Sequence, residues 1–259
     1  MSPVDEHPGE ARASVQELPW DSAQFGIGVG TIDLDRAGAH EALANDAARF
    51  DLIYARTRSD GALDENACEQ WNGALVDRRV TFARTVAGGD IAAPSLPGEI
   101  RSLGVTDPLT DRALELAPQA ATYSRFRTDP RFPDAWTDAL YRVWMQNSLS
   151  RERADDVLAY VEGDELHGLY TVRVVGDDAN LELFAVDEPM RGRGIGRALL
   201  AAGLAWMRDH EIACATVTTQ LENPACALYR ACGYSEAERE AIYHLWPRDG
   251  ATAQANEPS

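Results

Sequence analysis

The sequence predicts an α/β (α+β) fold in which a mixed sheet is covered by helices and is preceded by a smaller α/β module. Two observations carry this prediction. Three strand patterns within 157–186 follow one another as an antiparallel meander, and strands and helices alternate along the chain after it. A Gly- and Pro-rich stretch at 88–98 separates this region from an earlier set of strands and helices. The chain of 259 residues is long enough for one or two domains with a sizeable core.

The composition of the chain ends and of the Gly- and Pro-rich stretch predicts the domain boundaries. Both ends are poor in large apolar residues and rich in Pro, Glu, Ala and Ser, which is typical of mobile tails. The expected organisation is a tail at 1–17, a small N-terminal module at 18–93, a linker at 94–98, a main domain at 99–246 and a tail at 247–259.

Short runs of β-branched and apolar residues predict the strands of the N-terminal module, and helical spacing predicts its helices. The expected elements are a strand at 27–32, a helix at 39–50, a strand at 51–56, a helix at 63–71 and an extended stretch at 74–86. Gly26, Gly28 and Gly30 are spaced like a nucleotide-binding loop, but no strand precedes them and no helix follows directly. We therefore expect a turn or a bulge there.

The main domain shows the same two periodicities more clearly. Trp136, Leu140 and Trp144, for example, follow the spacing of one helix face. The expected elements are a strand at 99–103, helices at 108–121 and 134–149, strands at 157–161, 166–175 and 181–186, a helix at 195–209, a strand at 213–219, a short helix at 224–232 and a closing strand at 241–246.

The charged residues exclude several classes of protein. The chain has 42 Asp and Glu against 24 basic residues, all of them arginine, and its formal net charge is −18. Without lysine there is no Schiff-base site, no anchor for pyridoxal phosphate, no P-loop lysine and no ATP lysine of a protein kinase. The pI near 4.6 argues against nucleic acid as the main partner. A GC-rich genome and adaptation to high salt explain the missing lysine equally well.

The remaining composition predicts a soluble, cytoplasmic protein that holds no metal. The polar, acidic start lacks the features of a secretion signal, and the longest apolar stretch, around 198–207, is too short to span a bilayer. The four cysteines form no C-x-x-C pair, and the five histidines show no metal-ligand spacing. A homodimer is an open alternative for its assembly.

The strongest chemical signal is a glycine-rich turn between a strand and a helix within 186–200. Glycines permit close backbone approach, and the N–H groups and dipole at a helix start attract an anion such as pyrophosphate. The dinucleotide fingerprint G-x-G-x-x-G does not fit the spacing. An ordinary loop with surface arginines is the alternative, and three arginines in so acidic a chain make it the weaker one. The candidate anion-binding residues are Arg191, Gly192, Arg193, Gly194, Ile195, Gly196 and Arg197.

Two blocks of this region resemble the GNAT superfamily of acetyltransferases. Arg191, Gly194 and Gly196 are similar to the R-x-x-G-x-G pattern of that family's acetyl-CoA pyrophosphate loop. The second block, at 221–234, reads LENPACALYRACGY and resembles the family's N-x-x-A-x-x-L-Y-x-x-x-G-F segment. The resemblance implies a GNAT-type domain at 99–246, acetyl-CoA as co-substrate and N-acetyltransferase activity. It also implies that the strand before the loop contacts the pantetheine arm through the backbone of three residues, namely Phe184, Ala185 and Val186.

The resemblance further implies roles for individual side chains. Tyr229 would be the general acid that protonates the departing CoA thiolate, for which a phenol is suited by its high pKa. The alternative for Tyr229 is an aromatic ring that packs its helix onto the sheet. Asn223 is a candidate contact to the co-substrate, although the family's asparagine usually lies seven residues before the tyrosine, where this chain has Glu222. Glu182 alternates with apolar neighbours, so it either faces the cleft as a general base acting through water or lies on a solvated strand face.

A narrower resemblance covers most of the chain. The segments 18–26, LPWDSAQFG, and 123–132, YSRFRTDPRF, are similar to bacterial TDP-fucosamine acetyltransferases. These enzymes acetylate a nucleotide-linked amino-deoxysugar and carry a small N-terminal α/β module. In the second segment, arginines suited to bidentate phosphate binding alternate with an aromatic that can stack on a base or a sugar. The alternative is a surface turn whose phenylalanines belong to the core. The candidate substrate-binding residues are Arg125, Phe126, Arg127 and Arg131.

The two resemblances together imply direct transfer of an acetyl group from acetyl-CoA to the primary amine of a nucleotide-linked amino-deoxysugar in a ternary complex. The amine would lose its proton to water or Glu182, backbone N–H near Val186 would hold the oxyanion, and Tyr229 would protonate the thiolate. One alternative is a GNAT acetyltransferase that acts on a protein N-terminus or a small metabolite amine. Another is an acetyl-CoA-binding sensor or interaction module.

Overall fold

The computed structural model describes residues 13–58, 63 and 65–247, and its contacts divide the chain into two compact units. Unit 1 comprises 1–77 and 240–259, and unit 2 comprises 78–239. The boundaries fall inside the strands β4 (Ala74–Thr85) and β10 (Ser235–Leu245), so each of these strands runs from one unit into the other. This division differs from the expected one, because the stretch at 88–98 lies within unit 2 and the chain returns to unit 1 after residue 239.

Unit 1 is built on a sheet whose strands follow the order β1-β2-β3-β10. β2 and β3 are parallel, whereas β1 and β10 are antiparallel to their neighbours. Residues 13–17, expected in a tail, are folded, because Val15 is buried in the core of this unit and β1 pairs with β2. The rest of that expected tail, and 248–259 of the other, lie outside the described residues. The elements of unit 1 besides β4 and β10 are β1 (Gln16–Glu17), α1 (Pro19–Phe25), β2 (Val29–Asp33), α2 (Ala39–Asp46), the 3₁₀ helix η1 (Ala47–Arg49), β3 (Leu52–Thr57) and α3 (Glu65–Gln70).

Unit 2 is built on a mixed sheet with the strand order β4-β9-β8-β7-β6-β5. The strands from β5 to β8 form an antiparallel meander, β8 and β9 are parallel, and β9 is antiparallel to β4. The strands added here are β5 (Glu99–Ser102), β6 (Asp156–Glu162), β7 (Glu165–Val175), β8 (Asp178–Val186) and β9 (Cys214–Gln220). The predicted α/β fold, with a mixed sheet covered by helices, is confirmed.

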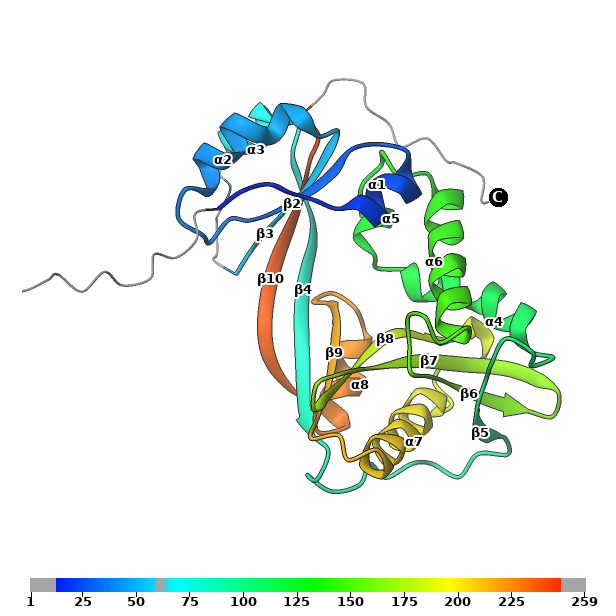
Figure 1. Ribbon diagram of the computed structural model, residues 1–259. Coiled ribbons are helices and arrows are strands. Elements are labelled where there is room, and N and C mark those ends of the chain that lie inside the picture. Colours follow the sequence, from blue (N-terminus) through cyan, green and yellow to red (C-terminus); the bar gives the residue numbers. More distant parts are fainter. Residues whose placement is uncertain (1–12, 59–62, 64, 248–259) are drawn as a thin grey trace, which may run out of the picture. The chain divides into compact units, whose positions relative to one another are not determined.

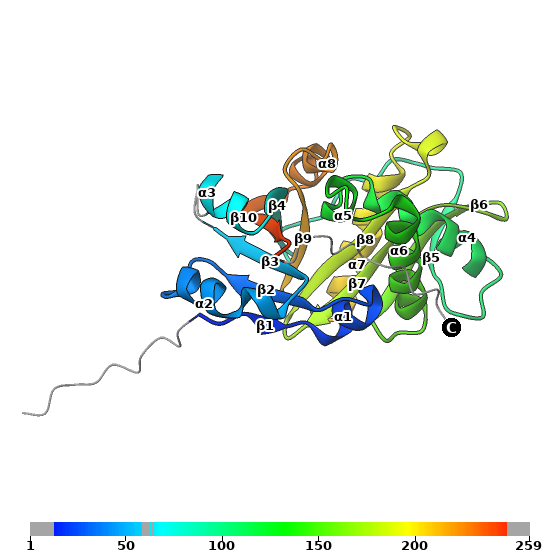
Figure 2. The same ribbon diagram turned by 90° about the horizontal axis from the view of Figure 1, so that it is seen from above.

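Helices cover both faces of the unit 2 sheet (Figures 1 and 2). Because neighbouring residues of a strand point to opposite faces, each strand supplies two cores. On one face, Leu169 of β7 packs with Met145 of α6, and on the other, its neighbour Tyr170 packs with Leu199 of α7. The helices are α4 (Thr110–Leu116), η2 (Ala117–Ala121), α5 (Arg125–Thr128) and α6 (Asp134–Leu149), then η3 (Glu188–Met190), α7 (Ile195–Asp209) and α8 (Ala225–Ala231).

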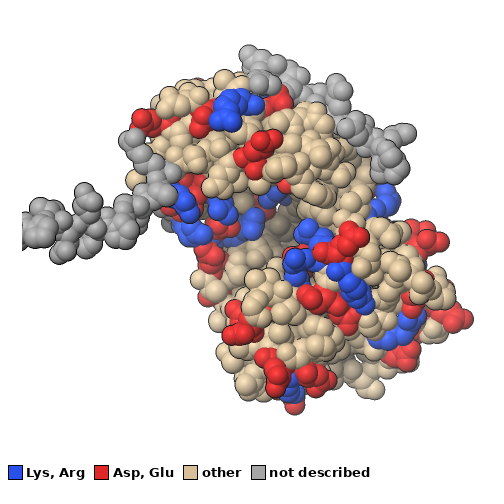
Figure 3. Space-filling model, in the orientation of Figure 1, with Lys and Arg blue, Asp and Glu red and all other residues tan. Residues whose placement is uncertain are grey.

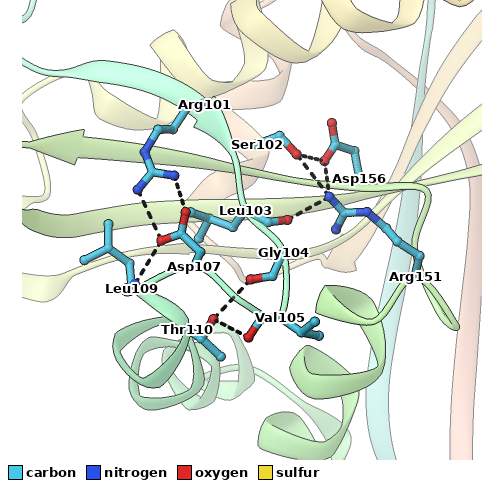
Figure 4. A network of polar contacts seen from close by, with 10 residues as sticks. All are labelled: Arg101, Ser102, Leu103, Gly104, Val105, Asp107, Leu109, Thr110, Arg151 and Asp156. Atoms are coloured by element: carbon cyan, nitrogen blue, oxygen red, sulfur yellow. Dashed lines mark hydrogen bonds and ion pairs between the residues drawn. The ribbon is translucent and has the colours of Figure 1, made fainter.

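A polar network fixes the connection from β5 to α4 (Figure 4). Asp107 is paired with Arg101 and accepts a hydrogen bond from the Leu109 backbone N–H at 2.9 Å. The guanidinium of Arg101 and this backbone bond hold the pKa of Asp107 below its ordinary value. Arg151, just after α6, donates to the Leu103 carbonyl at 2.7 Å and to Asp156 at 2.8 Å. The network therefore joins the start of α4 and the end of α6 to the β5–β6 edge of the sheet.

One buried polar atom in this core leads to a stability prediction. Tyr170 of β7 is buried under α7, and its hydroxyl has no hydrogen-bond partner among the described residues. A buried donor without a partner costs roughly 1–3 kcal/mol, so we expect Tyr170→Phe to raise the free energy of unfolding by about 1 kcal/mol. Tyr160→Phe is the matched control, because that buried hydroxyl accepts from Gly98 N–H at 3.1 Å and its loss should destabilise. Urea unfolding of both variants measures the difference, and a Tyr170→Phe protein less stable than the parent would contradict the expectation.

Candidate active site

The site begins where two parallel strands of unit 2 separate. β8 and β9 pair from Asp178 opposite Cys214 to Leu181 opposite Val217, and then diverge although both strands continue. β8 stays paired with β7 and β9 stays paired with β4. Within the described residues, the backbone edge of β8 beyond Leu181 that leaves β9 has no strand partner. It is an open row of N–H and C=O groups inside the sheet.

A bulge in β8 accounts for this separation. Tyr170 is opposite Phe184 and Val172 is opposite Leu181, so two residues of β8 face the single residue Thr171 of β7. The Thr171 hydroxyl accepts a hydrogen bond from Leu183 N–H at 3.0 Å and replaces the missing ladder bond. A bulge bends its strand and redirects a side chain. Here it turns β8 away from β9 at the first unpaired residue.

The gap between the two strands is part of a cavity of about 310 Å³ in unit 2. Its walls come from η2, β8, β9, the start of α7 and α8. Among the described residues that line it, only Glu182 and Arg191 are of charged types, and most of the others are aromatic or uncharged polar. The predicted residues that line it are Glu182, Phe184, Ala185, Val186, Arg191, Gly196, Asn223 and Tyr229.

The glycine-rich loop leads directly into the start of α7, as the sequence predicted. Gly194 is the residue before the helix and has φ 91°, a left-handed conformation that other residues rarely adopt. At Gly196 the constraint is space, because a Cβ there would lie 3.0 Å from Leu228 and 3.3 Å from the Phe184 ring. The first N–H groups of this 15-residue helix have no partner within it and meet the cavity at Gly196. This end of the cavity is therefore suited to an anion.

The other predicted residues of the loop are arranged differently around this helix start. Arg193 is exposed, whereas Ile195 is buried in the core beneath the loop. Arg197 donates to the Ala231 carbonyl at 3.3 Å, at the end of α8. Gly192, like these three, is not among the residues that line the cavity. The loop thus presents Arg191 and the helix start to the cavity, and its remaining members lie around them.

Arg191 is held by a chain of polar contacts that reaches η2. Its Nε donates to the Val186 carbonyl at 2.9 Å, and its Nη2 donates to the side-chain oxygen of Gln119 at 3.0 Å. The amide nitrogen of Gln119 donates to Asp187 at 2.9 Å, and Arg112 donates to the same carboxylate at 2.6 Å. Burial opposes the charge on Asp187, but the bonds from Gln119 and Arg112 hold its pKa below the ordinary value.

Tyr229 of α8 is both a packing residue and a cavity residue. Its ring lies 5.8 Å from Phe82 and 6.2 Å from Phe184, measured between ring centroids. Burial raises the pKa of Tyr229 well above its ordinary value, so the phenol stays protonated at any physiological pH. No hydrogen bond to its hydroxyl is found within the described part of the chain. The packing role and the proton-donor role considered from sequence are therefore compatible.

Glu182 lies in the bulge of β8 and lines the cavity, with its carboxylate 3.0 Å from Arg153. Arg153 also lies over the Trp144 ring, 4.7 Å from its centroid. The arginine does not line the cavity, so within the described residues Glu182 is the member of this ion pair that faces it. Asn223 has a more local role, because it donates to Thr219 at 3.0 Å and accepts from Ala225 N–H at 3.0 Å at the start of α8.

The second arginine cluster does not line the cavity. Phe126 is buried, with its ring 5.1 Å from Phe132 and 6.4 Å from Trp144. The expectation that Phe126 stacks on a base or sugar is therefore corrected: its ring belongs to the core beside α6, as the alternative held. Arg127 forms ion pairs with Asp134 at 2.6 Å and with Asp138. Arg125 and Arg131 are half-buried in the same segment.

Several cavity residues were missed by the sequence reasoning. The carboxyl end of β9 contributes three polar residues, which are Thr218, Thr219 and Gln220. The general rule that ligands bind beyond the carboxyl ends of parallel strands points to them. η2 and the segment after it contribute Gln119, Ala120, Thr122 and Tyr123, and α6 contributes Tyr141. Tyr123 opens the segment 123–132 already singled out in the sequence, whereas no motif marks the other four, which reach the cavity through tertiary packing.

The surface of unit 2 carries charges of both signs. Figure 3 shows basic and acidic side chains beside one another on the face of unit 2 that is in view, the lower body there. In the described part of the chain, no group of three or more His, Cys, Asp or Glu is placed to hold a metal. None of the described helices combines the length and apolar character that crossing a membrane requires.

Comparisons with known proteins point to one family. Residues 121–234 match the model of the Acetyltransferase (GNAT) family. The spore coat polysaccharide biosynthesis protein SpsD of Bacillus subtilis is 29% identical over 139 residues, which are 53% of this chain and 48% of that protein. The aminoglycoside N(6')-acetyltransferase type 1 of Stenotrophomonas maltophilia is 31% identical over 130 residues, which are 43% of this chain and 85% of that protein.

A similarity to solved structures extends the likeness of fold to both units. The GCN5-related N-acetyltransferase from Sphaerobacter thermophilus superposes with a TM-score of 0.58 at 18% identity, covering 94% of this chain and 79% of that one. The two sequence matches given above are shorter, and the region shared with the spore coat protein spans about half of that relative's length.

Proposed function

This chain belongs to the GNAT family of acetyltransferases, and from that premise we propose that unit 2 transfers the acetyl group of acetyl-CoA to a primary amine carried by a sugar. The observation that carries the proposal is the junction of three features in one cavity. An open backbone edge on β8, a helix start suited to pyrophosphate and a protonated tyrosine all line it.

The residues of the cavity fit acetyl-CoA as the donor. The N–H and C=O groups of β8 at 184–186 that have no strand partner, apart from the Val186 carbonyl that Arg191 occupies, suit the amides of a pantetheine arm, which would pair with them as a further strand does. The start of α7 and Arg191 suit the pyrophosphate. A Cβ at Gly196 would fill the space between Leu228 and Phe184 that these contacts need. The donor supplies an activated acyl group, and the protein supplies alignment and proton transfer.

Each step of the proposed reaction has a residue in the cavity. Glu182 takes the proton of the acceptor ammonium through water, which leaves a neutral amine that attacks the thioester carbonyl. Backbone N–H near Val186 donates to the carbonyl oxygen as negative charge develops on it. Tyr229 donates its proton to the sulfur as the C–S bond breaks, the nitrogen releases its extra proton to water as the amide forms, and water then returns a proton to the phenolate. Holding both reactants in one narrow cavity supplies much of the remaining rate enhancement.

The choice of a sugar acceptor is supported by the cavity walls and by the relatives. Tyr123 and Tyr141 present aromatic surface, and Thr218 and Gln220 present groups that bind hydroxyls. One relative is named for polysaccharide biosynthesis and another for N-acetylation of aminoglycosides. The finer form of the proposal is a nucleotide-linked amino-deoxysugar. Its phosphates would bind Arg125 and Arg131, which follow the cavity residue Tyr123 in the sequence.

A panel of amines tests this function. The full chain is incubated with acetyl-CoA and a nucleotide-linked amino sugar, a free amino sugar, an aminoglycoside or a peptide with a free N-terminus, and the released thiol is measured. We expect turnover with the amine-bearing sugars and little with the peptide. Preference for the nucleotide-linked sugar supports the finer form. Binding of acetyl-CoA without turnover of any amine would favour the sensor alternative and overturn the proposal.

The proposed base leads to a prediction about pH. Glu182→Gln is expected to lower kcat/KM about 100-fold at neutral pH, where the acceptor amine is protonated and needs a base. The loss should shrink as the pH rises towards the pKa of the amine, because the substrate then supplies its own neutral form. Arg153→Met is the matched control, since it removes the partner of Glu182 but keeps the carboxylate. A loss that is constant across the pH range would assign Glu182 to binding instead.

A further inference from the structure

We infer that Gln119 of η2 is a positioning residue that fixes Arg191 for binding the pyrophosphate of the donor, an inference that rests on the proposed function. Gln119 lies 72 positions before Arg191 in the chain, outside both sequence blocks that resemble the family. Its assignment comes from the geometry of its side-chain amide, which lies between a guanidinium and a carboxylate.

The chemistry of the two partners determines how the amide of Gln119 is oriented. Arg191 has only donors, so it can meet only the amide oxygen, which lies 3.0 Å from its Nη2. An ionised Asp187 has only acceptors, so it can meet only the amide nitrogen, which lies 2.9 Å away. A flipped amide would face a donor with a donor and an acceptor with an acceptor. The two hydrogen bonds therefore allow only one orientation of the Gln119 side-chain amide.

Asp187, which accepts from Gln119, is itself held in place by other hydrogen bonds. Its backbone N–H donates to the His167 carbonyl at 2.8 Å, and its carboxylate accepts from Arg112 at 2.6 Å. It follows directly after β8, so its position is set by the same strand that lines the cavity. The contacts run in the order Arg112, Asp187, Gln119 and Arg191, and each member is held by the one before it.

This chain of contacts matters because Arg191 is an exposed residue. A long side chain that is free in solution loses rotamer entropy when a ligand immobilises it. Here the Val186 carbonyl and the Gln119 side chain already hold Nε and Nη2 of Arg191 before a ligand binds. The remaining guanidinium nitrogen, Nη1, is left for the anion. Gln119 thus preorganises Arg191 without touching the reacting atoms.

Gln119 also connects the two ends of the cavity. Gln119 and Ala120 of η2 both line it, and the following residues Thr122 and Tyr123 form part of the wall proposed for the acceptor. Because Gln119 joins Arg191 to η2, an anion bound to Arg191 also restricts the position of η2. Loss of the Gln119 amide should weaken binding of the pyrophosphate part of the donor without affecting the thiol end.

A double-mutant cycle on the full chain tests this role by calorimetric titration with CoA. We expect Gln119→Ala to weaken CoA binding about 5- to 10-fold, as for the lost preorganisation of one long side chain, and Arg191→Ala to weaken it more. If Gln119 acts through Arg191, the double variant should bind CoA no more weakly than Arg191→Ala alone. Gln146→Ala on the exposed side of α6 is the matched control and should bind like the parent.

Pantetheine, which lacks the pyrophosphate, is the second probe, and its affinity is read from competition with acetyl-CoA. Gln119→Ala should leave this affinity unchanged. Additive losses in the double variant, or an equal loss for pantetheine and CoA, would overturn the inference and make Gln119 a general support of the cavity wall. A folded parent protein that does not bind CoA at all would instead overturn the proposed function, and the inference with it.

Discussion

Tyr229→Phe is expected to lower kcat about 100-fold or more, the range seen when a general acid is removed, while the affinity for CoA stays unchanged. The reason is the position of the hydroxyl in a cavity whose aromatic walls keep it protonated. Phenylalanine keeps the ring contacts with Phe82 and Phe184, so the packing of α8 should survive. Initial rates of thiol release give kcat, and calorimetric titration gives the dissociation constant of CoA.

Tyr234→Phe is the matched control for this experiment. Tyr234 is also buried, its ring lies 6.0 Å from that of Tyr229, and it does not line the cavity. Its hydroxyl should therefore be dispensable for turnover. If the Tyr229→Phe enzyme retains the parent's kcat, the phenol is not the acid and Tyr229 is a packing residue only. Equal losses in both variants would point to a disturbed core.

Gly203→Ala should have the largest effect on stability, a loss of at least about 3 kcal/mol, at the upper end of the range for overpacked cores. Gly203 lies on the buried side of α7, and a Cβ there would be 1.2 Å from the Tyr170 hydroxyl oxygen and 2.3 Å from Cζ. The helix would have to lift from β7 to make room. Because the first turn of α7 forms the anion-binding end of the cavity, CoA affinity should fall together with the melting temperature.

Two further variants separate this clash from a general effect of alanine. Gly104→Ala places a Cβ where nothing lies within 4 Å, so its stability should stay close to that of the parent. Combining Gly203→Ala with Tyr170→Phe removes the atom at 1.2 Å and should restore part of the loss. Thermal unfolding followed by circular dichroism measures all four proteins. A Gly203→Ala protein as stable as the parent would show that α7 does not pack this closely on β7.

Two helices that begin directly after a proline or a glycine were predicted from sequence with the right bounds. The helix expected at 134–149 starts after Pro133, the helix expected at 195–209 starts after Gly194, and both bounds are confirmed. β10 was expected at 241–246 but begins at Ser235. Its first residues are mostly exposed and polar, so they lack the apolar alternation that marks a half-buried strand.

The candidate site was predictable where its residues are local in sequence. Arg191, Gly196 and Tyr229 lie in two short blocks and meet in one cavity. Gln119 could not be predicted, because its role depends on a contact with Arg191 across 72 positions. The position of Phe126 was not predictable either, since an aromatic between arginines reads equally well as a stacking surface or as core. In the structure, the contacts of Phe126 with the rings of Phe132 and Trp144 place it in the core.

The separation of β8 from β9 also determines which molecules can use the open backbone. A strand at the outer edge of a sheet offers its free groups to any extended polypeptide, which is a route to aggregation. Here the free groups lie between two strands that remain paired on their outer sides with β7 and β4. An incoming strand needs spacing of about 4.8 Å on each side and room for side chains above and below. The free groups of β8 therefore lie inside the sheet, where an incoming chain has to fit between β8 and β9, and not along an outer edge that is open on one side.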